Sequence, residues 1–195
     1  IPGKVTRLLG KFCDHVALGI PSATDYLPEC RTIFTGTPVR SEFFTDQSLP
    51  SWAPQGEGEL IVVIGGSQGA IKMNEMVRRI IPWLLDKGFR VIHLTGKNDS
   101  YYKNSDKVTT HDNLAVRQFS NEISALLQNA DLAISRAGSG AICELMATKT
   151  PAVLIPFPSS ADQHQELNAA YMARYGGAVI VNQHDPEKDI LKNTI

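Results

Sequence analysis

The stretch Leu60–Ala70, which reads LIVVIGGSQGA, decides the fold of this 195-residue chain. Leu60–Ile64 is a continuous apolar run, which is typical of a strand that is buried on both faces of a parallel sheet. A glycine-rich turn, Gly65–Gly69, follows the strand, and a helical pattern extends from about Ala70 to Lys87. Strand, glycine turn and helix together predict the first unit of a doubly wound α/β domain.

The same rhythm continues to the end of the chain. Further strands are predicted at residues 89–94, 114–119, 132–135, 152–155 and 178–181, and further helices at 122–128, 141–148 and 163–175. Strands that alternate with helices indicate parallel βαβ units. We therefore predict an α/β fold whose main part, residues 59–195, is a doubly wound, Rossmann-like parallel sheet.

The residues before 59 have a different organisation. Lys4–Phe12 combines apolar residues at helical spacing with basic residues, and short strands are predicted at 15–20 and 31–35. Residues 41–58 are rich in Asp, Gln, Ser, Pro and Gly with little apolar period, which predicts a linker. The chain starts at Ile1 without a signal-peptide pattern, and we expect it to begin inside a longer protein.

The overall composition excludes several classes of protein. Lys+Arg number 19 and Asp+Glu 20, and this near-neutral balance argues against nucleic acid as a partner. No apolar stretch approaches the roughly 20 residues of a membrane-spanning helix. The three cysteines lack CxxC spacing and therefore indicate neither a disulfide framework nor a zinc site. These features favour a reduced, cytosolic globular protein.

The Gly65–Gly69 turn is a candidate phosphate site. Glycines let backbone N–H groups approach an anion, and the N-terminus of the following helix adds partial positive charge. The alternative is a tight turn that needs glycine only for its geometry. The spacing matches neither GxGxxG nor a Walker loop. The next strand ends at His93–Gly96 without a carboxylate, which disfavours NAD binding.

A second turn of this type, Ser135–Ala141, precedes another predicted helix. Two such turns in one sheet favour a diphosphate, because each can cover part of it. Glu144 follows in the first turns of the helix, where a carboxylate can accept hydrogen bonds from a ribose diol. Favourable interaction with the helix dipole is the equally simple alternative. A nucleophile elbow at Ser139 is excluded, because GxSxG requires glycine where Ala137 stands.

A third polar group lies in Pro156–Asn168 after the next strand. Asp162, His164, Gln165 and Asn168 cluster there at the start of a helix and can contact sugar hydroxyls, although helix capping and solvation also explain them. His164 has no partner at metal-ligand spacing, and the chain has no DxD pair, so we expect no metal cofactor. Negative charge must then be met by backbone amides, helix ends and a basic side chain.

Five separated motifs carry a resemblance to a known family. They are GGSQGA at 65–70, SRAGSGAICEL at 135–145, PFPSSADQHQELNA at 156–169, IPGKVTRLLGKF at 1–12 and GTPVR at 36–40. In order and spacing they resemble the MurG glycosyltransferases. The resemblance implies a GT-B arrangement of two Rossmann-like domains, in which residues 1–40 end the N-terminal acceptor domain, 41–58 link the domains and 59–195 form the donor domain.

The resemblance also implies an activity and a set of site residues. MurG enzymes transfer N-acetylglucosamine from UDP-GlcNAc to undecaprenyl-pyrophosphoryl-N-acetylmuramoyl-pentapeptide, converting lipid I to lipid II with inversion. The implied contacts are Arg40, Gly66, Ser67, Gln68 and Gly69 for the diphosphate, Phe119, Ser120 and Ile123 for uracil, Gly138, Ser139, Gly140 and Ala141 for the diphosphate, Glu144 for the ribose, and His164 and Gln165 for the sugar.

The sequence departs from the family pattern in three places. Gly138–Ala141 replaces a run such as GAST, which puts one hydroxyl contact to the phosphate in doubt, and GTPVR replaces GNPVR. The N-terminal glycine-rich loop that carries the family's candidate base is absent. We therefore expect the catalytic base in an N-terminal half outside this sequence, and we expect this chain alone to be inactive.

Two other functions remain open from the sequence. One is a nucleotide-sugar-binding module that works with a partner chain; the other is a related GT-B enzyme, either a glycolipid synthase or a UDP-GlcNAc 2-epimerase. The basic residues of 4–12 indicate contact with an anionic membrane, as in a peripheral protein on the inner face of the bacterial plasma membrane. The alternative is that this helix packs its apolar face on its own domain.

Overall fold

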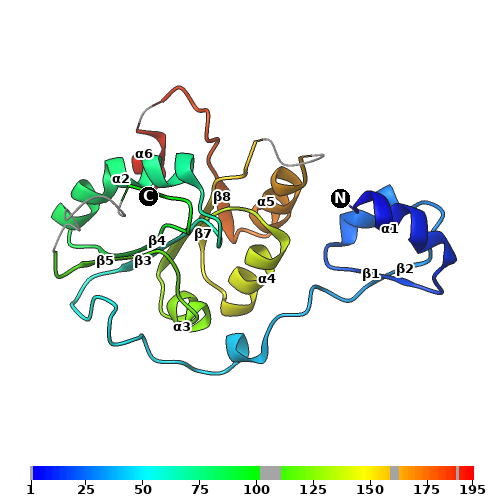
Figure 1. The fold of residues 1–195 in the computed structure, drawn as a ribbon, viewed down its shortest axis with the longest axis horizontal. Helices are drawn as coiled ribbons and strands as arrows, with labels where there is room; N and C mark the ends of the chain where they lie inside the picture. Colours follow the sequence, from blue (N-terminus) through cyan, green and yellow to red (C-terminus); the bar gives the residue numbers. More distant parts are fainter. Residues whose placement is uncertain (1, 102–110, 159–162, 188) are drawn as a thin grey trace.

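The computed structural model describes residues 2–101, 111–158, 163–187 and 189–195. The described residues form two parallel sheets, a small one near the N-terminus and a large one that fills the rest of the chain (Figure 1). The strands of the large sheet are β3 (Leu60–Ile64), β4 (Arg90–Leu94), β5 (Leu114–Arg117), β6 (Leu132–Ser135), β7 (Ala152–Leu154) and β8 (Ala178–Ile180).

The strand order in the large sheet is β5-β4-β3-β6-β7-β8. The first strand in sequence, β3, therefore lies in the middle, and Ile61 pairs with Val91 of β4 on one side and with Leu132 of β6 on the other. The chain winds outward from β3 in both directions, which confirms the predicted doubly wound parallel sheet. In such a sheet the crevice beyond the carboxyl ends of the two strands at the change of direction is the usual ligand site.

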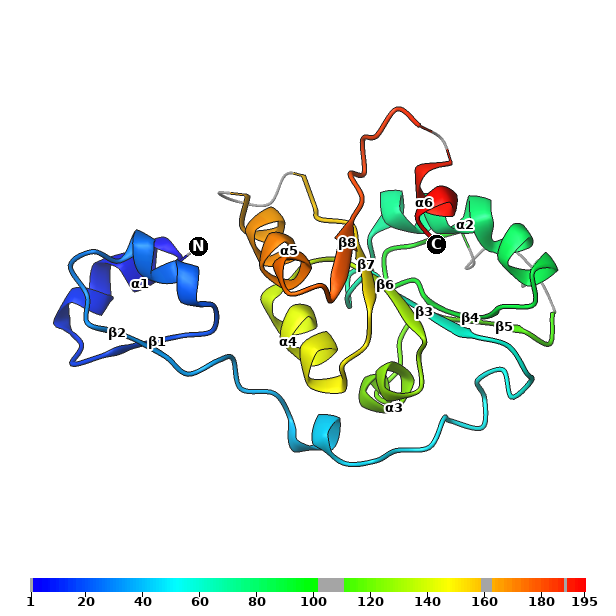
Figure 2. The ribbon, with the colours of Figure 1, turned by 180° about the vertical axis from the view of Figure 1, so that it is seen from behind.

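Helices cover both faces of this sheet (Figures 1 and 2). One face carries α2 (Ile71–Asp86) and α6 (Ile190–Thr194), and the other carries α3 (Ile123–Gln128), α4 (Ser139–Thr148) and α5 (His164–Arg174). The residues of β3 alternate between the two layers, because Ile61 and Val63 pack under α2 whereas Leu60 and Val62 pack beside α3. This two-sided burial explains the continuous apolar run of the strand.

Helix α2 shows why the helical pattern after the first glycine turn is so clear. Its residues Met73, Val77, Ile80 and Leu84 recur every three or four positions, and all are buried. The helix stops before Gly88, whose φ of +85° is the left-handed conformation that ends many helices. Within residues 59–195 the predicted helices and strands match observed ones within one or two residues at their ends; α4, for example, begins at Ser139 rather than at residue 141. Helix α6 was not predicted.

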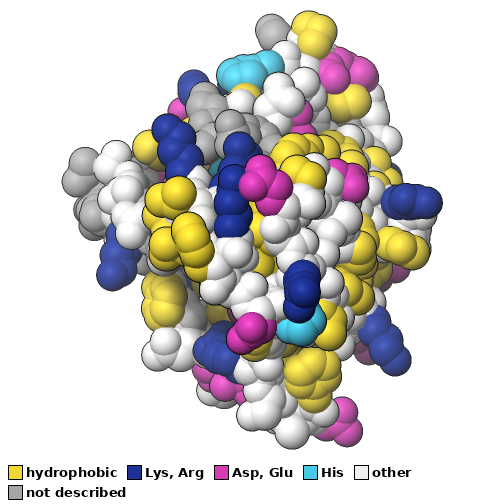
Figure 3. Space-filling model, turned by 90° about the vertical axis from the view of Figure 1, so that its right-hand side faces the viewer, with side chains coloured by type: hydrophobic (Ala, Val, Ile, Leu, Met, Phe, Trp, Pro, Cys, Tyr) yellow, Lys and Arg dark blue, Asp and Glu magenta, His cyan; other side chains and the backbone are white. Residues whose placement is uncertain are grey.

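The N-terminal part contains α1 (Lys4–Leu9), β1 (Val16–Leu18), β2 (Thr32–Phe34) and the 3₁₀ turns Gly10–Phe12 and Pro21–Tyr26. It lies at one end of the molecule, and Figure 3 shows hydrophobic and basic side chains side by side on that end. In this chain the apolar residues Val5, Leu8, Leu9 and Phe12 are each more than half exposed, so they are not packed on the rest of the chain. Within the described ranges, no helix has the length and apolar character to cross a membrane.

Residues 41–58, the connecting segment, run along the large domain (Figure 2). Phe43, in a 3₁₀ turn at Ser41–Phe44, is buried against α3 and α4, and Ala53 is buried beside Leu60. Gln47 N–H donates to Gln128 Oε1 of α3 at 2.9 Å. The composition predicts a linker between two domains, and the structure adds that this segment packs on the large domain. Its few buried residues are irregularly spaced and give no periodic signal.

Candidate functional site

A cavity of about 440 Å³ opens at the carboxyl ends of β3 and β6, where the winding of the sheet changes direction. Most of the predicted site residues contribute to its wall. The lining residues are Ile64, Gly65, Gly66, Ser67, Leu94, Gln118, Phe119, Ile123, Ser135, Arg136, Gly138, Gly140, Ala141, Glu144 and Gln165. The structure thus brings both glycine turns to one cavity.

The first glycine turn connects β3 to α2. Gly66 and Gly69 have φ values of +83° and +87°, which L side chains rarely adopt, and a Cβ on Gly69 would lie 2.5 Å from Thr95 O. Gly66 and Ser67 line the cavity, whereas Gln68 and Gly69 pack against the loop after β4. Gln68 and Gly69 therefore support the turn, and the cavity is contacted by Gly66 and Ser67.

The second glycine turn connects β6 to α4. The first helical hydrogen bond runs from Ile142 N–H to Gly138 O, so the amides at the start of the helix are available for an anion. Gly138, Gly140 and Ala141 line the cavity. Ser139 instead lines a second cavity, of about 240 Å³, which lies between the start of α4 and the N-terminal part of the chain.

Glu144 lies one turn into α4, and its carboxylate reaches the cavity wall. Its side chain is 30% exposed, and burial raises the pKa of this carboxyl, with Arg40 acting to lower the pKa and Glu42 to raise it. Arg40 lies 3.9 Å from the Glu144 carboxylate and 2.9 Å from that of Glu42. The guanidinium also lies over the ring of Phe43. Arg40 is therefore next to Glu144, but the cavity wall formed by the described residues does not include it.

Phe119 and Ile123 form the wall of the cavity near the end of β5. Ser120 lies between them in sequence but is buried, and its Oγ accepts the N–H of Glu122 at 3.0 Å. The Glu122 carboxylate in turn accepts the indole N–H of Trp52 at 2.7 Å. The side chain of Ser120 therefore shapes the loop, and the connecting segment braces that loop from outside.

Gln165 lines the cavity from α5, and its Oε1 accepts the N–H of Phe157 at 2.9 Å. His164 is the first residue of the same helix, and the cavity wall formed by the described residues does not include it. Asn168, one turn further on, donates from its amide to Ala137 O at 3.0 Å and so holds α5 against the second glycine turn. Asp162, part of the predicted polar cluster, lies outside the described residues.

Sequence reasoning assigned no role to Arg136, which also lines the cavity. Its guanidinium donates to Ile155 O and Pro156 O at 2.9 and 3.1 Å and to Gln183 at 2.5 Å. Burial lowers the pKa of Arg136 to about 10, which leaves it charged at neutral pH. The sequence did contain a signal for this residue, because an arginine directly after a buried strand needs hydrogen-bond partners at the end of that strand.

The family comparison agrees with this geometry. The family model described as glycosyltransferase family 28 C-terminal domain matches residues 60–195. The chain belongs to glycosyltransferase family 28. The match begins at the first residue of β3 and covers both glycine turns, Glu144 and Gln165, so the whole cavity lies within the family 28 domain.

Curated relatives are similar over the full chain. A protein of Prochlorococcus marinus (strain NATL2A) is 76% identical over all 195 residues, and one of Synechococcus sp. (strain CC9605) is 57% identical. Each is named UDP-N-acetylglucosamine--N-acetylmuramyl-(pentapeptide) pyrophosphoryl-undecaprenol N-acetylglucosamine transferase. The chain covers 55% and 53% of these proteins, and so spans about half the length of the curated relatives it matches.

Solved structures share the fold. Acinetobacter baumannii MurG superposes on the whole chain with a TM-score of 0.72 at 22% identity, and the match covers 54% of that protein. The kitacinnamycin glycotransferase superposes on 93% of the chain, and on 45% of its own length, with a TM-score of 0.67 at 20% identity. These likenesses confirm the GT-B type fold that the sequence predicts for this family 28 chain.

Proposed function

We propose that this chain forms the UDP-GlcNAc-binding half of an inverting N-acetylglucosamine transferase that converts lipid I to lipid II in peptidoglycan synthesis. The observation that carries the proposal is that two glycine turns and the Glu144 carboxylate meet in one cavity at the change of winding of the sheet. The sugar, the nucleotide and the lipid-linked acceptor in the proposal are taken from the names of the relatives that match this chain over all its residues.

Each part of the cavity matches one part of the donor. The amides of Gly66–Ser67 and the start of α4 face the diphosphate, and Glu144 accepts hydrogen bonds from the ribose hydroxyls. Phe119 and Ile123 offer an apolar surface for the uracil ring, and Gln165 is placed for the sugar hydroxyls. In the proposal the Arg40 guanidinium, which lies beside Glu144, contacts the diphosphate of the donor.

The proposed transfer is a single displacement. A hydroxyl of the acceptor sugar attacks the anomeric carbon, the bond from that carbon to the diphosphate breaks, and the hydroxyl proton passes to a base of the N-terminal half. Negative charge grows on the leaving diphosphate, and fixed backbone amides stabilise it without reorganisation. The proposal assigns this role to the two glycine turns and their helix N-termini, without a metal cofactor.

Calorimetric titration of the chain with UDP-GlcNAc, UDP-glucose, UDP and uridine tests the proposal. We expect the three diphosphate ligands to bind more tightly than uridine, because the glycine turns contact only the diphosphate. UDP-GlcNAc should bind more tightly than UDP-glucose if Gln165 and its neighbours contact the acetamido sugar. Absence of binding by every uridine ligand at millimolar concentration would overturn the proposal.

A nucleotide-sugar-binding module is the second candidate function, and it is favoured by the position of most of the predicted donor contacts in one cavity of this chain. The chain spans about half of its curated relatives, and the proposed base lies outside it. In that case the chain alone should bind UDP-GlcNAc without releasing UDP, and joining it to the N-terminal half of a relative should restore transfer. Release of UDP by the chain alone in the presence of acceptor would contradict the module.

We also propose that the complete protein is a peripheral protein on the cytoplasmic face of the plasma membrane. The exposed apolar residues of the 4–12 segment lie beside Lys4, Arg7 and Lys11, a pattern that suits an anionic surface. Sedimentation with anionic liposomes, before and after neutralisation of these three side chains, tests this location; unchanged sedimentation would argue against it.

A further inference from the structure

The loop after β4, residues 95–99, lies directly behind the first glycine turn. Lys97 N–H donates to Ser67 O at 3.1 Å, and Asn98 N–H donates to Gln68 O at 3.1 Å. Both carbonyls belong to the glycine turn, which presents its other side to the cavity. The position of this loop therefore determines how the backbone of the turn is oriented.

The contact between the two loops is made by backbone atoms at their closest point. Gly96 has a φ of +79°, and a Cβ on it would lie 2.2 Å from both the N and the Cα of Gly69. Gly69 in turn would place a Cβ 2.5 Å from Thr95 O. Because no side chain separates the loops, a shift of one must move the other.

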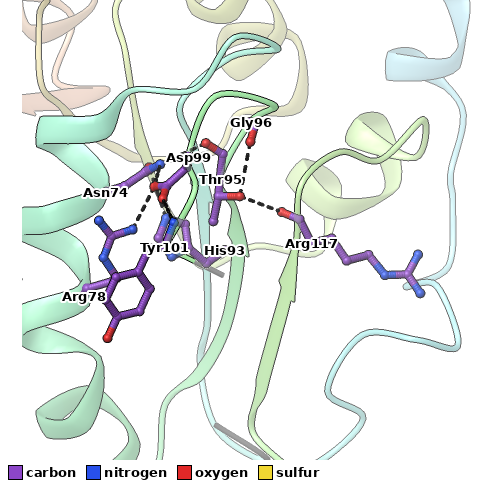
Figure 4. Close-up of polar contacts among 8 residues, drawn as sticks. All are labelled: Asn74, Arg78, His93, Thr95, Gly96, Asp99, Tyr101 and Arg117. Atoms are coloured by element: carbon purple, nitrogen blue, oxygen red, sulfur yellow. Dashed lines mark hydrogen bonds and ion pairs between the residues drawn. The ribbon is translucent and has the colours of Figure 1, made fainter. Parts of the chain in front are cut away.

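A buried polar network holds the loop after β4 to helix α2 (Figure 4). Asn74 of α2 is fully buried, and its amide nitrogen donates to Thr95 O at 2.9 Å and to Asp99 Oδ2 at 2.6 Å. Its amide oxygen lies 3.1 Å from Nε2 of the buried His93. One side chain thus fixes both ends of the 95–99 loop.

Asp99 is tied to α2 a second time, one turn further along the helix. Its carboxylate accepts Arg78 Nη1 at 2.7 Å and the N–H of Tyr101 at 3.0 Å, and the Arg78 guanidinium lies 4.4 Å from the centre of the Tyr101 ring (Figure 4). Asp99 is only 3% exposed. Burial opposes its ionisation, but the hydrogen bonds from Arg78 and Asn74 outweigh burial and keep the pKa of this carboxyl low.

Such a network is a poor source of stability for its own sake. Desolvation of a buried ion pair costs free energy that well-packed apolar residues of similar volume avoid. What the network does provide is a defined geometry, because each of its hydrogen bonds requires its donor and acceptor to be aligned. The segment whose geometry the network fixes is the 95–99 loop, which supports the glycine turn.

We propose that Asn74 and Asp99 are positioning residues for the diphosphate. They fix residues 95–98, which hold the carbonyls of Ser67 and Gln68 and thereby direct the amides of the glycine turn into the cavity. Neither side chain is part of the cavity wall formed by the described residues, so both act through the turn. This inference rests on the proposed function, since it assigns the turn to the donor diphosphate.

Comparison of two ligands isolates this role. UDP and uridine share the base and ribose, and only UDP carries the diphosphate. In titrations of the full chain, Asp99→Asn, which keeps the shape of the side chain, should weaken UDP binding about five- to tenfold and leave uridine binding within about twofold. Asn74→Leu should act in the same way and more strongly, because it removes both amide donors.

Thr150→Val is the matched control. Thr150 is as buried as Asp99 and donates to Leu127 O at 2.7 Å, but it lies beyond the far end of α4. This substitution should lower the thermal midpoint and leave the ratio of UDP to uridine affinity unchanged. If Asn74→Leu fails to fold, Asp99→Asn carries the test.

The outcomes separate this inference from the function on which it rests. If wild-type chain binds UDP and uridine and Asp99→Asn keeps their ratio of affinities, the positioning role is wrong and the donor site stands. An equal loss for both ligands would likewise overturn the role, since it would show a general structural effect. If wild-type chain binds neither ligand, the proposed function itself fails.

Discussion

Glu144 is the residue whose surroundings bear most directly on the proposed donor site. Its carboxylate is half-buried on the cavity wall, and burial raises its pKa, yet Arg40 lies 3.9 Å away and favours the ionised form. An ionised carboxylate has acceptors for both hydroxyls of a diol. The residue is therefore suited to bind the ribose rather than to exchange a proton with the reacting sugar.

Glu144→Ala should therefore raise the KM for the donor more than it lowers kcat. The ribose contacts are the same in the ground state and in the transition state, so their loss weakens binding uniformly. Steady-state kinetics of the chain joined to an N-terminal half would measure both constants, with the exposed Glu57→Ala as control. An unchanged KM would remove Glu144 from the ribose site.

At the scale of elements, the connecting segment is a structural part of the large domain. Phe43 is 2% exposed and belongs to the same buried cluster as Ile142 and Leu145 of α4, whereas its neighbour Phe44 is 68% exposed. Further along the segment, Trp52 donates to Glu122 and lies under the guanidinium of Arg117. The segment thus supports two of the elements that form the cavity.

Phe43→Ala should lower the free energy of unfolding by about 3–5 kcal/mol, because a large side chain leaves a cavity in a packed core. Phe44→Ala, the same substitution one residue later, should change it by less than about 0.5 kcal/mol, since the ring is in solvent. Urea denaturation of the chain measures both. Equal effects of the two substitutions would show that the segment is a free linker.

For the whole molecule, the buried network at α2 and β4 couples folding to pH. Burial, aided by the charge of Arg78, lowers the pKa of His93 to about 4 from an ordinary value of 6.5, and Asp99 acts in the opposite direction. Between these two values the unfolded chain binds a proton at this histidine and the folded chain does not. The free energy of unfolding must therefore fall as pH drops from about 6.5 toward 4.

We expect this loss to approach 1.4 kcal/mol per pH unit, the limit of about one proton. Urea denaturation at pH 6.5 and pH 5 gives the slope, and His93→Gln should reduce it by most of that amount. The exposed His184→Gln, which makes the same change outside the network, should keep the wild-type slope. A slope in His93→Gln equal to that of wild type would show that the folded protein already accepts the proton.

Much of this architecture was predictable from local sequence. Apart from α6 (Ile190–Thr194), which was not predicted, the strands and helices of residues 60–195 were found because each carries a period or a glycine turn that its own residues define. The two glycine turns and Glu144 were found for the same reason. By contrast, the partners of Arg136, which lie 19 to 47 residues away in sequence, have no local signature.

The sequence by itself determined the order of strands and helices and the places where the backbone must turn on glycine, because these depend on neighbours in the chain. Only the tertiary structure decided that Arg136 lines the cavity the two turns share, that Ser139 lines a different one, and that Asn74 and Asp99 lie behind the first turn. Those relations depend on the order in which strands pair, and strand pairing joins residues that are distant in sequence.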